Sequence, residues 1–205
     1  MKKGIRNILN FFLHFVFKRF MVYKETIEFT NKQALLRSFK KIGANSSFGK
    51  DNIIKNPNYI EIGDNFSALD RFRIEAWDSY FEQKFEPKII IGNNVNFNTD
   101  IHIGCINSIT IGDNCLFGSR IYITDHNHGD TSDGMIAKAP VERPLISKGA
   151  VVIEHNVWVG EGVVIMPGIT IGANSIIGAN SVVTKDVPKN TVVAGVPAKI
   201  LKQLV

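Results

Sequence analysis

The chain has 205 residues, 44% of them apolar, and a formal net charge of +5 from 24 Lys and Arg against 19 Asp and Glu. This size supports one domain with a core and appended segments, and the small charge excess argues against a nucleic-acid binder. The two cysteines, Cys105 and Cys115, exclude a disulfide-rich secreted scaffold, so the sequence predicts a reduced, cytoplasmic protein.

Residues 1–40 are predicted to be helical. The apolar run Ile8–Phe17 has about ten residues, against roughly 20 needed to span a bilayer, and Lys18-Arg19 follows it in place of a signal-peptide cleavage site. Its Phe content and basic flanks fit a helix in the membrane interface, a peripheral contact. The alternative, which the sequence favours, is a helix packed on the domain or on a neighbouring subunit. One face of the helix carries Ile5, Leu9, Phe12, Val16 and Phe20.

A six-residue repeat follows and is most regular near the C-terminal end. Apolar residues recur there at every sixth position: Ile153, Val159, Ile165, Ile171, Ile177 and Val183. Six is a multiple of the strand period of two but not of the helical 3.6, so these side chains share a face only in an extended chain. This repeat is typical of a parallel β-helix with three short strands and roughly 18 residues per turn. A β-sandwich of short strands is the alternative, but it rarely keeps one period over so many units.

The repeat extends upstream with shifts of phase. Earlier runs begin at Ile42, Ile91 and Ile111. The spacing between Ile123 and Ile153 is a multiple of six, so the segment between them can leave the coil and re-enter it in register. We therefore predict an all-β coil over residues 41–190.

Two insertions are predicted to interrupt this coil, at residues 70–88 and 129–148. The first contains Arg73–Trp77, whose alternation of charged and apolar residues suggests a β-hairpin or excursion. The second is rich in Gly, Asp, Ser and Pro and is expected to be an extruded, exposed loop. Long loops on a rigid scaffold are where sites tend to be built. Residues 191–205 leave the repeat and are expected to fold back or cap the last coil.

The candidate chemistry lies beside the second insertion, in Asp125-His126-Asn127-His128-Gly129. His126 and His128 are two residues apart, so in an extended chain they point the same way. A neutral imidazole can take a proton from a hydroxyl at neutral pH. A single histidine is as often a structural contact as a functional group, but a pair beside an extruded loop favours a site. Cys115 takes the small-residue place of its repeat, which indicates a packed thiol and not a nucleophile.

Four motifs follow one another along the second half of the chain. They are Ile111–His128, Asn156-Val157-Trp158-Val159-Gly160, Ile177–Asp186 and Ala194–Lys199. Together they resemble the hexapeptide-repeat O-acetyltransferases over roughly residues 90–200. The resemblance is greatest to the galactoside and maltose acetyltransferases and to the lipopolysaccharide and capsule O-acetyltransferases. The Arg73–Trp77 and Asp125–Gly129 segments are more similar to the polysaccharide-modifying branch.

The resemblance implies a left-handed parallel β-helix that moves an acetyl group from acetyl-CoA directly to a hydroxyl of a carbohydrate acceptor, without a metal. It also implies a homotrimer with the site between adjacent prisms. His128 would be the general base, while His126 falls where other members often have threonine. The acceptor would be contacted by Asn98, Asp100, Arg73 and Trp77. The coenzyme would be bound by Trp158, Gly160, Ala179, Thr184, Lys185 and Lys199.

Two other functions use the same coil. A γ-class carbonic anhydrase binds zinc through three histidines, and imidazole is a good zinc ligand. Candidates for such a site are His102, His126, His128 and His155. The Thr184-Lys185 and Pro197-Ala198-Lys199 cluster has no use in a hydratase and argues against it. A non-enzymatic assembly protein would leave the paired histidines and the Trp158 motif without a role.

Overall fold

The computed structural model describes residues 2–204, and the backbone alone at residues 2–9, 28 and 32. The chain forms two compact units, one up to Ser38 and one from Phe39 onward. The first unit is a single helix, α1 (Lys2–Ser38). The side chains of Ile5 and Leu9, predicted to share one helix face, lie outside the described residues. Within residues 2–204, no helix combines the length and hydropathy needed to cross a bilayer.

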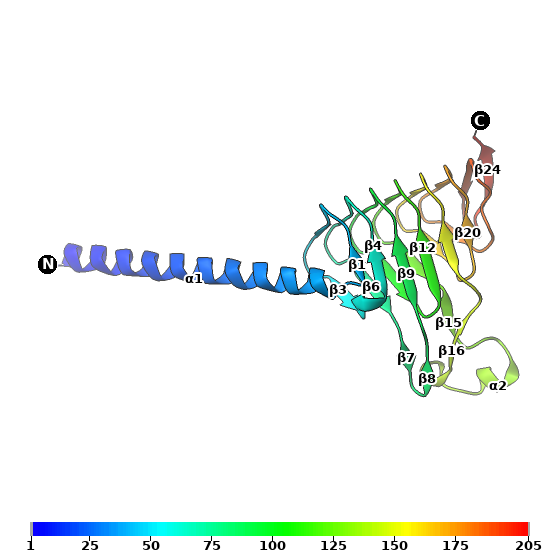
Figure 1. The fold of residues 1–205 in the computed structure, drawn as a ribbon, viewed down its shortest axis with the longest axis horizontal. Helices are drawn as coiled ribbons and strands as arrows, with labels where there is room; N and C mark the ends of the chain where they lie inside the picture. Colours follow the sequence, from blue (N-terminus) through cyan, green and yellow to red (C-terminus); the bar gives the residue numbers. More distant parts are fainter. Residues whose placement is uncertain (1, 205) are drawn as a thin grey trace. The chain divides into compact units, whose positions relative to one another are not determined.

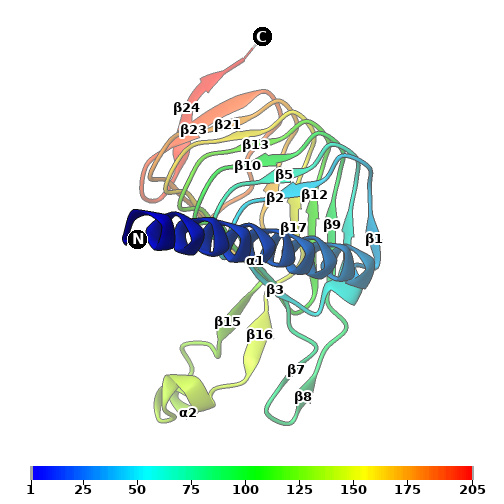
Figure 2. The ribbon, with the colours of Figure 1, turned by 90° about the vertical axis from the view of Figure 1, so that its left-hand side faces the viewer.

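The second unit is a coil of three parallel sheets, the arrangement of a left-handed parallel β-helix (Figures 1 and 2). The first sheet contains β1 (Lys41–Ile42), β4 (Ile60–Ile62), β9 (Lys88–Ile91), β12 (Ser108–Ile111), β17 (Val151–Ile153) and β20 (Thr170–Ile171). The second contains β2 (Ser47–Phe48), β5 (Ser67–Ala68), β10 (Asn96–Phe97), β13 (Leu116–Phe117), β18 (Trp158–Val159), β21 (Ile176–Ile177), β23 (Thr191–Ala194) and β24 (Lys199–Gln203). The third contains β3 (Ile53–Lys55), β6 (Arg73–Ala76), β11 (His102–Cys105), β14 (Tyr122–Thr124), β19 (Val164–Ile165) and β22 (Val182–Val183).

The repeat positions form the core of this coil, as predicted. From Ile91 onward the sixth-position side chains are buried, whereas those of the first coil, such as Phe48, are half-buried. Stacked aromatic rings fill the N-terminal coils, with Phe97 and Phe117 centroids 4.3 Å apart, and aliphatic side chains fill the later ones. Ile123 pairs with Ile165, so the chain does re-enter the coil in register after the second insertion.

The N-terminal coils are longer than the predicted turn of roughly 18 residues. Ile91 pairs with Ile111, whereas Ile153 pairs with Ile171, so the earlier turn takes up more of the chain than the later one. The reason is that β6 and β11 each have four residues where β19 has two. These longer strands give the third sheet a second outward-facing position in the coils that carry the insertions.

Asparagine side chains stabilise the corner between the first and second sheets. The amide of Asn45 bonds that of Asn65, which bonds Asn94, which in turn bonds Asn114, at 2.9–3.0 Å. All four residues have positive φ, a conformation that asparagine tolerates better than most residues. The Asn and Asp that follow each aliphatic residue in the sequence are therefore corner residues.

The first insertion is shorter than the predicted 70–88. Arg73–Ala76 does not form a hairpin but is strand β6 of the coil, paired with β3 and β11 in parallel. Alternation occurs in coil strands as well as in hairpins, so the pattern could not separate the two. The excursion is residues 77–87, which we call the first arm. It contains the antiparallel pair β7 (Ser79–Tyr80) and β8 (Gln83–Lys84).

The second insertion, residues 126–147, is called the second arm. It contains β15 (His126–His128), α2 (Asp133–Ile136), the 3-10 turn η2 (Pro140–Glu142) and β16 (Leu145–Ser147). Both arms project from the same side of the coil (Figures 1 and 2). They bind each other, because Gln83 makes two hydrogen bonds with the backbone of Leu145, at 2.7 and 3.1 Å, and the Tyr80 hydroxyl donates to the Val141 carbonyl.

The C-terminal segment, predicted to begin at residue 191, starts inside the coil. Thr191–Ala194 is strand β23, which pairs with β21 in parallel and so continues the second sheet. The chain then reverses, and β24 pairs with β23 in antiparallel orientation.

Candidate active site

The arms and the third sheet enclose a cavity of about 150 Å³ that we call the histidine cavity. One outward row of the sheet supplies Arg73, His102 and Tyr122, which are in register across neighbouring coils. The arms supply Trp77, Tyr80, His126, His128 and Leu145. The predicted catalytic pair and two of the predicted acceptor residues, Arg73 and Trp77, therefore line one cavity.

Glu75 organises the charged side of the cavity. Its nearly buried carboxylate lies 2.7 Å from Arg73 Nε and 3.1 Å from His102 Nε2. Burial and the nearby Arg73 cation lower the pKa of His102, and Glu75 opposes them. His102 is therefore neutral at pH 7. Because Nε2 donates to the Glu75 carboxylate, Nδ1 keeps its lone pair and can accept a hydrogen bond. Sequence reasoning had placed His102 only in the rival zinc site and missed Glu75.

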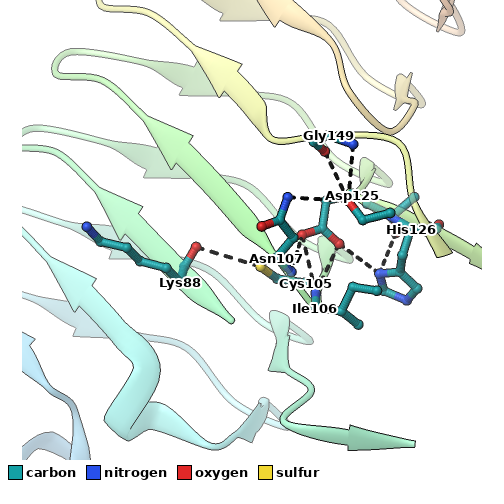
Figure 3. A network of polar contacts seen from close by, with 9 residues as sticks. Lys88, Cys105, Ile106, Asn107, Asp125, His126 and Gly149 are labelled. Carbon is teal, nitrogen blue, oxygen red and sulfur yellow. Dashed lines mark hydrogen bonds and ion pairs between the residues drawn. The ribbon is translucent and has the colours of Figure 1, made fainter. Parts of the chain in front are cut away.

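His126 is held by the preceding residue. Asp125 is fully buried, and its Oδ1 lies 2.9 Å from His126 Nδ1, whose side chain is 11% exposed (Figure 3). A carboxylate accepts but does not donate, so the proton of the neutral ring resides on Nδ1 and Nε2 keeps its lone pair. This is the tautomer that can accept a proton from a substrate hydroxyl.

The Asp125 carboxylate is itself held by hydrogen bonds from the preceding coil. The backbone amides of Ile106 and Asn107 donate to it at 3.0 and 2.7 Å, and the Cys105 thiol donates at 3.2 Å (Figure 3). Three donors offset the cost of burying the charge. Burial and the adjacent carboxylate raise the pKa of Cys105, so the thiol stays protonated and keeps donating.

Gly104 leaves room for this imidazole. A Cβ at Gly104 would lie 3.4 Å from His126 Cε1 and 3.9 Å from His102 Nε2. Gly104 occupies the second outward row of the third sheet, between Glu75 and Thr124. A larger side chain would fill the space between the two rings.

His128 is more weakly held than His126. It is exposed, and its Nδ1 lies 3.4 Å from the Tyr80 hydroxyl, which donates to the Val141 carbonyl. The two rings meet edge to face, with centroids 5.4 Å apart. His128 thus lines the rim of the cavity through arm-to-arm contacts, without a carboxylate partner among the described residues.

The other predicted acceptor residues lie elsewhere. Asn98 is exposed just after β10 in the second sheet. Asp100 sits at the corner that follows, where Arg71 binds its carboxylate through two nitrogens. Neither residue lines the histidine cavity, and Asp100 already has a structural role in holding the corner.

The predicted coenzyme residues of the C-terminal end do come together. A hollow of about 400 Å³, called the basic hollow, is lined by Thr184, Lys185 and Lys199, by one carboxylate, Asp186, and by apolar residues. Lys185 follows β22, and Lys199 begins β24, so the reversal of the last strand brings the two cations to one site. Two lysines at one hollow are suited to phosphate.

Trp158 begins strand β18 of the second sheet, and Gly160 follows the end of that strand. Trp158 faces outward, is 52% exposed and lies in register with Leu116 and Ile176. It is therefore not a core residue, although core packing is the usual role of a single tryptophan. A Cβ at Gly160 would lie 2.7 Å from the backbone nitrogen of Ala179, which requires glycine there. Trp158 lines neither the histidine cavity nor the basic hollow.

In the part of the chain that the structure describes, no group of three or more His, Cys, Asp or Glu side chains could hold a metal ion. His102, His126 and His128 share a cavity, but Glu75 and Asp125 each bind one ring. His155 is exposed outside this cavity.

The chain is similar to known transferase families and proteins. Residues 150–185 match the family described as bacterial transferase hexapeptide (six repeats), and residues 108–123 match the hexapeptide repeat of succinyl-transferase. The chain is 41% identical over 153 residues to a protein of Escherichia coli K12 named as a lipopolysaccharide biosynthesis O-acetyl transferase, WbbJ. That match covers 73% of this chain and 74% of the relative.

Two further similarities concern galactoside acetyltransferases. The galactoside O-acetyltransferase of Escherichia coli K12 is 39% identical over 125 residues, which cover 58% of this chain and 56% of that protein. A solved galactoside acetyltransferase in complex with coenzyme A is 28% identical, with a TM-score of 0.55, and the match covers 85% of this chain and 70% of that one.

Proposed function

The chain belongs to the hexapeptide-repeat acetyltransferase family, and on that basis we propose that it transfers an acetyl group from acetyl-CoA to a hydroxyl of a sugar. The acceptor would be a unit of a polysaccharide or lipopolysaccharide precursor, because the relative that is 41% identical is named for lipopolysaccharide biosynthesis. The observation that carries the proposal is an imidazole with a free Nε2, held by a buried carboxylate inside a cavity of about 150 Å³.

We propose His126 as the general base and not His128, to which the resemblance assigned that role. His126 is held at 2.9 Å by the fully buried Asp125, whereas His128 is exposed and contacts only Tyr80 at 3.4 Å. A base whose ring is fixed loses less orientational freedom at the moment of proton transfer. His128 and Tyr80 instead form part of the acceptor wall.

Transfer then needs one proton acceptor and no covalent enzyme intermediate. His126 Nε2 takes the hydroxyl proton as the acceptor oxygen attacks the thioester carbonyl, and the imidazolium returns that proton to the departing thiolate. Asp125 stabilises the imidazolium while it exists. Neither cysteine can act as nucleophile, because both thiols are buried and burial raises the pKa of Cys115 to about 11.

The coenzyme fits the basic hollow by its charge. Lys185 and Lys199 would hold phosphate groups, with Thr184 beside them. Trp158, with backbone groups near Gly160 and Ala179, would wall the pantetheine channel. Arg73 and Trp77 would contact the acceptor inside the histidine cavity, and Asn98 could do so only from another copy of the chain.

We propose a homotrimer with the site at the junction between subunits. Trp158 faces outward from the second sheet, while His102 faces outward from the third. In one chain, the coenzyme residue Trp158 and the histidine cavity therefore face different directions. A neighbouring copy whose second sheet packs against the third sheet of this chain would complete the site. Unpaired, buried cysteines fit a reducing cytoplasm, where α1 would contact the inner face of the membrane.

The test is coenzyme A release with a panel of hydroxylated sugars, using His126→Gln and His128→Gln as a matched pair. We expect His126→Gln to lower kcat by about 10³-fold or more and His128→Gln by less than about 10²-fold, at unchanged coenzyme affinity. The opposite order would restore His128 as the base. Coenzyme release by neither the wild-type protein nor its variants, with any acceptor, would refute the transfer itself.

A further inference from the structure

The net positive charge of the protein comes from the start of α1. The first 23 residues contain five Lys or Arg and no Asp or Glu, whereas residues 24–205 contain 19 Lys or Arg and 19 Asp or Glu. The remainder of the chain is thus formally neutral, against +5 for the first 23 residues. Such an asymmetry predicts an anionic partner for the helix, separate from the partners of the coil.

Within this stretch, the described side chains from residue 10 onward are mostly exposed and are apolar on most of the helix circumference. Consecutive helix residues are turned by about 100°, so neighbours point in different directions. The exposed side chains, each between 46% and 75% accessible, are Phe11, Phe12, Leu13, Phe15, Val16 and Phe17. A surface helix of a globular protein has one narrow apolar stripe, whereas this wider apolar surface requires contact with protein or lipid.

Basic side chains follow this apolar stretch directly. Lys18 and Arg19 come next in sequence, and the Arg19 guanidinium lies 5.4 Å from the centre of the Phe15 ring. Long basic side chains reach from apolar surroundings toward headgroups while their stems stay in the apolar layer. The apolar stretch is too short to cross a bilayer, as about ten residues of helix extend about 15 Å against roughly 30 Å of hydrocarbon.

A bundle of α1 helices from several copies is the competing partner. It would place the five cations of each helix beside those of its neighbours, with no acidic residue in the same stretch of sequence to offset them. Like charges brought together along parallel helices destabilise the bundle. Anionic lipid headgroups satisfy both features of the segment, its charge and its apolar rings.

From this combination we propose that residues 10–23 of α1 bind the surface of an anionic lipid bilayer, with the Phe side chains in the headgroup and acyl boundary and Lys18 and Arg19 at the lipid phosphates. This names the lipid that the membrane contact of the proposed function requires, and in that respect it rests on the proposed function. A lipid-linked acceptor would then share a surface with the enzyme.

The test is co-sedimentation of the full chain with vesicles, without acetyl-CoA or acceptor. One set of vesicles is pure phosphatidylcholine, and the other contains phosphatidylglycerol at about one third. We expect binding to the anionic vesicles that weakens as salt rises. Neutralising two cations in Lys18→Gln/Arg19→Gln should weaken it by about 30-fold, at about 1 kcal/mol per charge. The control Lys50→Gln/Lys138→Gln makes the same charge change in the second unit and should leave binding unchanged.

A Phe12→Ser/Phe15→Ser variant tests the apolar part and should also lose binding. Equal binding to both kinds of vesicle would overturn the anionic-lipid proposal, as would equal effects of the two charge-neutralising double variants. Absence of vesicle binding, with a self-association that the Phe12→Ser/Phe15→Ser change abolishes, would assign the helix to a bundle of copies. Because no substrate is present, these outcomes leave the transfer reaction to be judged separately by coenzyme release.

Discussion

Replacement of Asp125 by asparagine tests how His126 is held. In the native protein the carboxylate accepts from the Ile106 and Asn107 amides and faces His126 Nδ1 at 2.9 Å. An asparagine with its oxygen in the place of Oδ2 would keep the bond from the Asn107 amide at 2.7 Å and the longer one from Ile106 at 3.3 Å. Its NH2 group would take the place of Oδ1 and face the ring, so the 3.0 Å bond from Ile106 would be lost. Nδ1 would then have to accept, which moves the ring proton to Nε2 and removes the lone pair that takes the substrate proton.

The magnitude follows from the loss of that tautomer. An Asp to Asn change that leaves the histidine of a Ser-His-Asp triad in the wrong tautomer costs about 10⁴ in kcat, and we expect a loss of about 10³ to 10⁴ for Asp125→Asn. At 1.36 kcal/mol per tenfold change this is about 4 to 5.5 kcal/mol of transition-state stabilisation. The assay is coenzyme A release followed by a thiol reagent, with kcat and KM determined separately.

The Michaelis constant for acetyl-CoA should stay within about threefold, because the basic hollow is built from other residues. Asp130→Asn is the matched control, since Asp130 is an exposed carboxylate of the second arm that bonds only Ser132 in the described structure. A kcat for Asp125→Asn near that of the wild type, in a protein with an unchanged circular dichroism spectrum, would rule out this role for the carboxylate.

Three other predictions address the rest of the molecule. Lys199→Ala should raise the KM for acetyl-CoA by about 10-fold, the effect of one charge-assisted hydrogen bond, while Lys202→Ala on the same strand should not; equal effects would exclude a phosphate site at Lys199. Cys105 and Cys115 are buried with raised pKa values, so a thiol reagent at pH 8 should modify neither until urea unfolds the protein; rapid reaction in the native state would contradict the packing. Burial lowers the folded-state pKa of His102, so the unfolded chain binds more protons than the folded one as the pH falls. The contribution of His102 to the free energy of unfolding should therefore be complete above about pH 6.5 and decrease below it. The urea midpoint should therefore drop less between pH 7.5 and 5.5 in His102→Gln than in the wild type, and parallel drops would refute the assignment.

The core was predictable because a six-residue period leaves one physical solution. Ile153, Ile165 and Ile177 can share an interior only in an extended chain, and all three are fully buried in the coil. The strand Arg73–Ala76 was misassigned because the same alternation serves a hairpin and a coil strand. Only the pairing partner distinguishes a coil strand from a hairpin strand, and this partner is His102–Cys105 in the next coil. Because an insertion lies between the two strands, the six-residue period does not predict that pairing.

The site was predictable in part for the same reason. His126 and His128, which are two residues apart, were identified from their spacing, and both line the cavity. Glu75 could not be found, because it reaches His102 only through the coil register. The sequence also placed Asp125 beside His126, but the backbone amides of Ile106 and Asn107, which donate to its carboxylate, lie in the preceding coil. A buried and fixed carboxylate partner is what distinguishes His126 from His128.

A crystal structure with coenzyme A bound would decide whether the histidine cavity and the basic hollow serve one reaction. We expect phosphate groups in the basic hollow at Lys185 and Lys199, Trp158 along the pantetheine arm, and the thiol sulfur beside a histidine cavity. An acceptor hydroxyl placed between that sulfur and His126 Nε2 should come within about 3.5 Å of the ring nitrogen. A coenzyme whose thiol ends on a surface remote from every His126 of the assembly would contradict the proposed transfer.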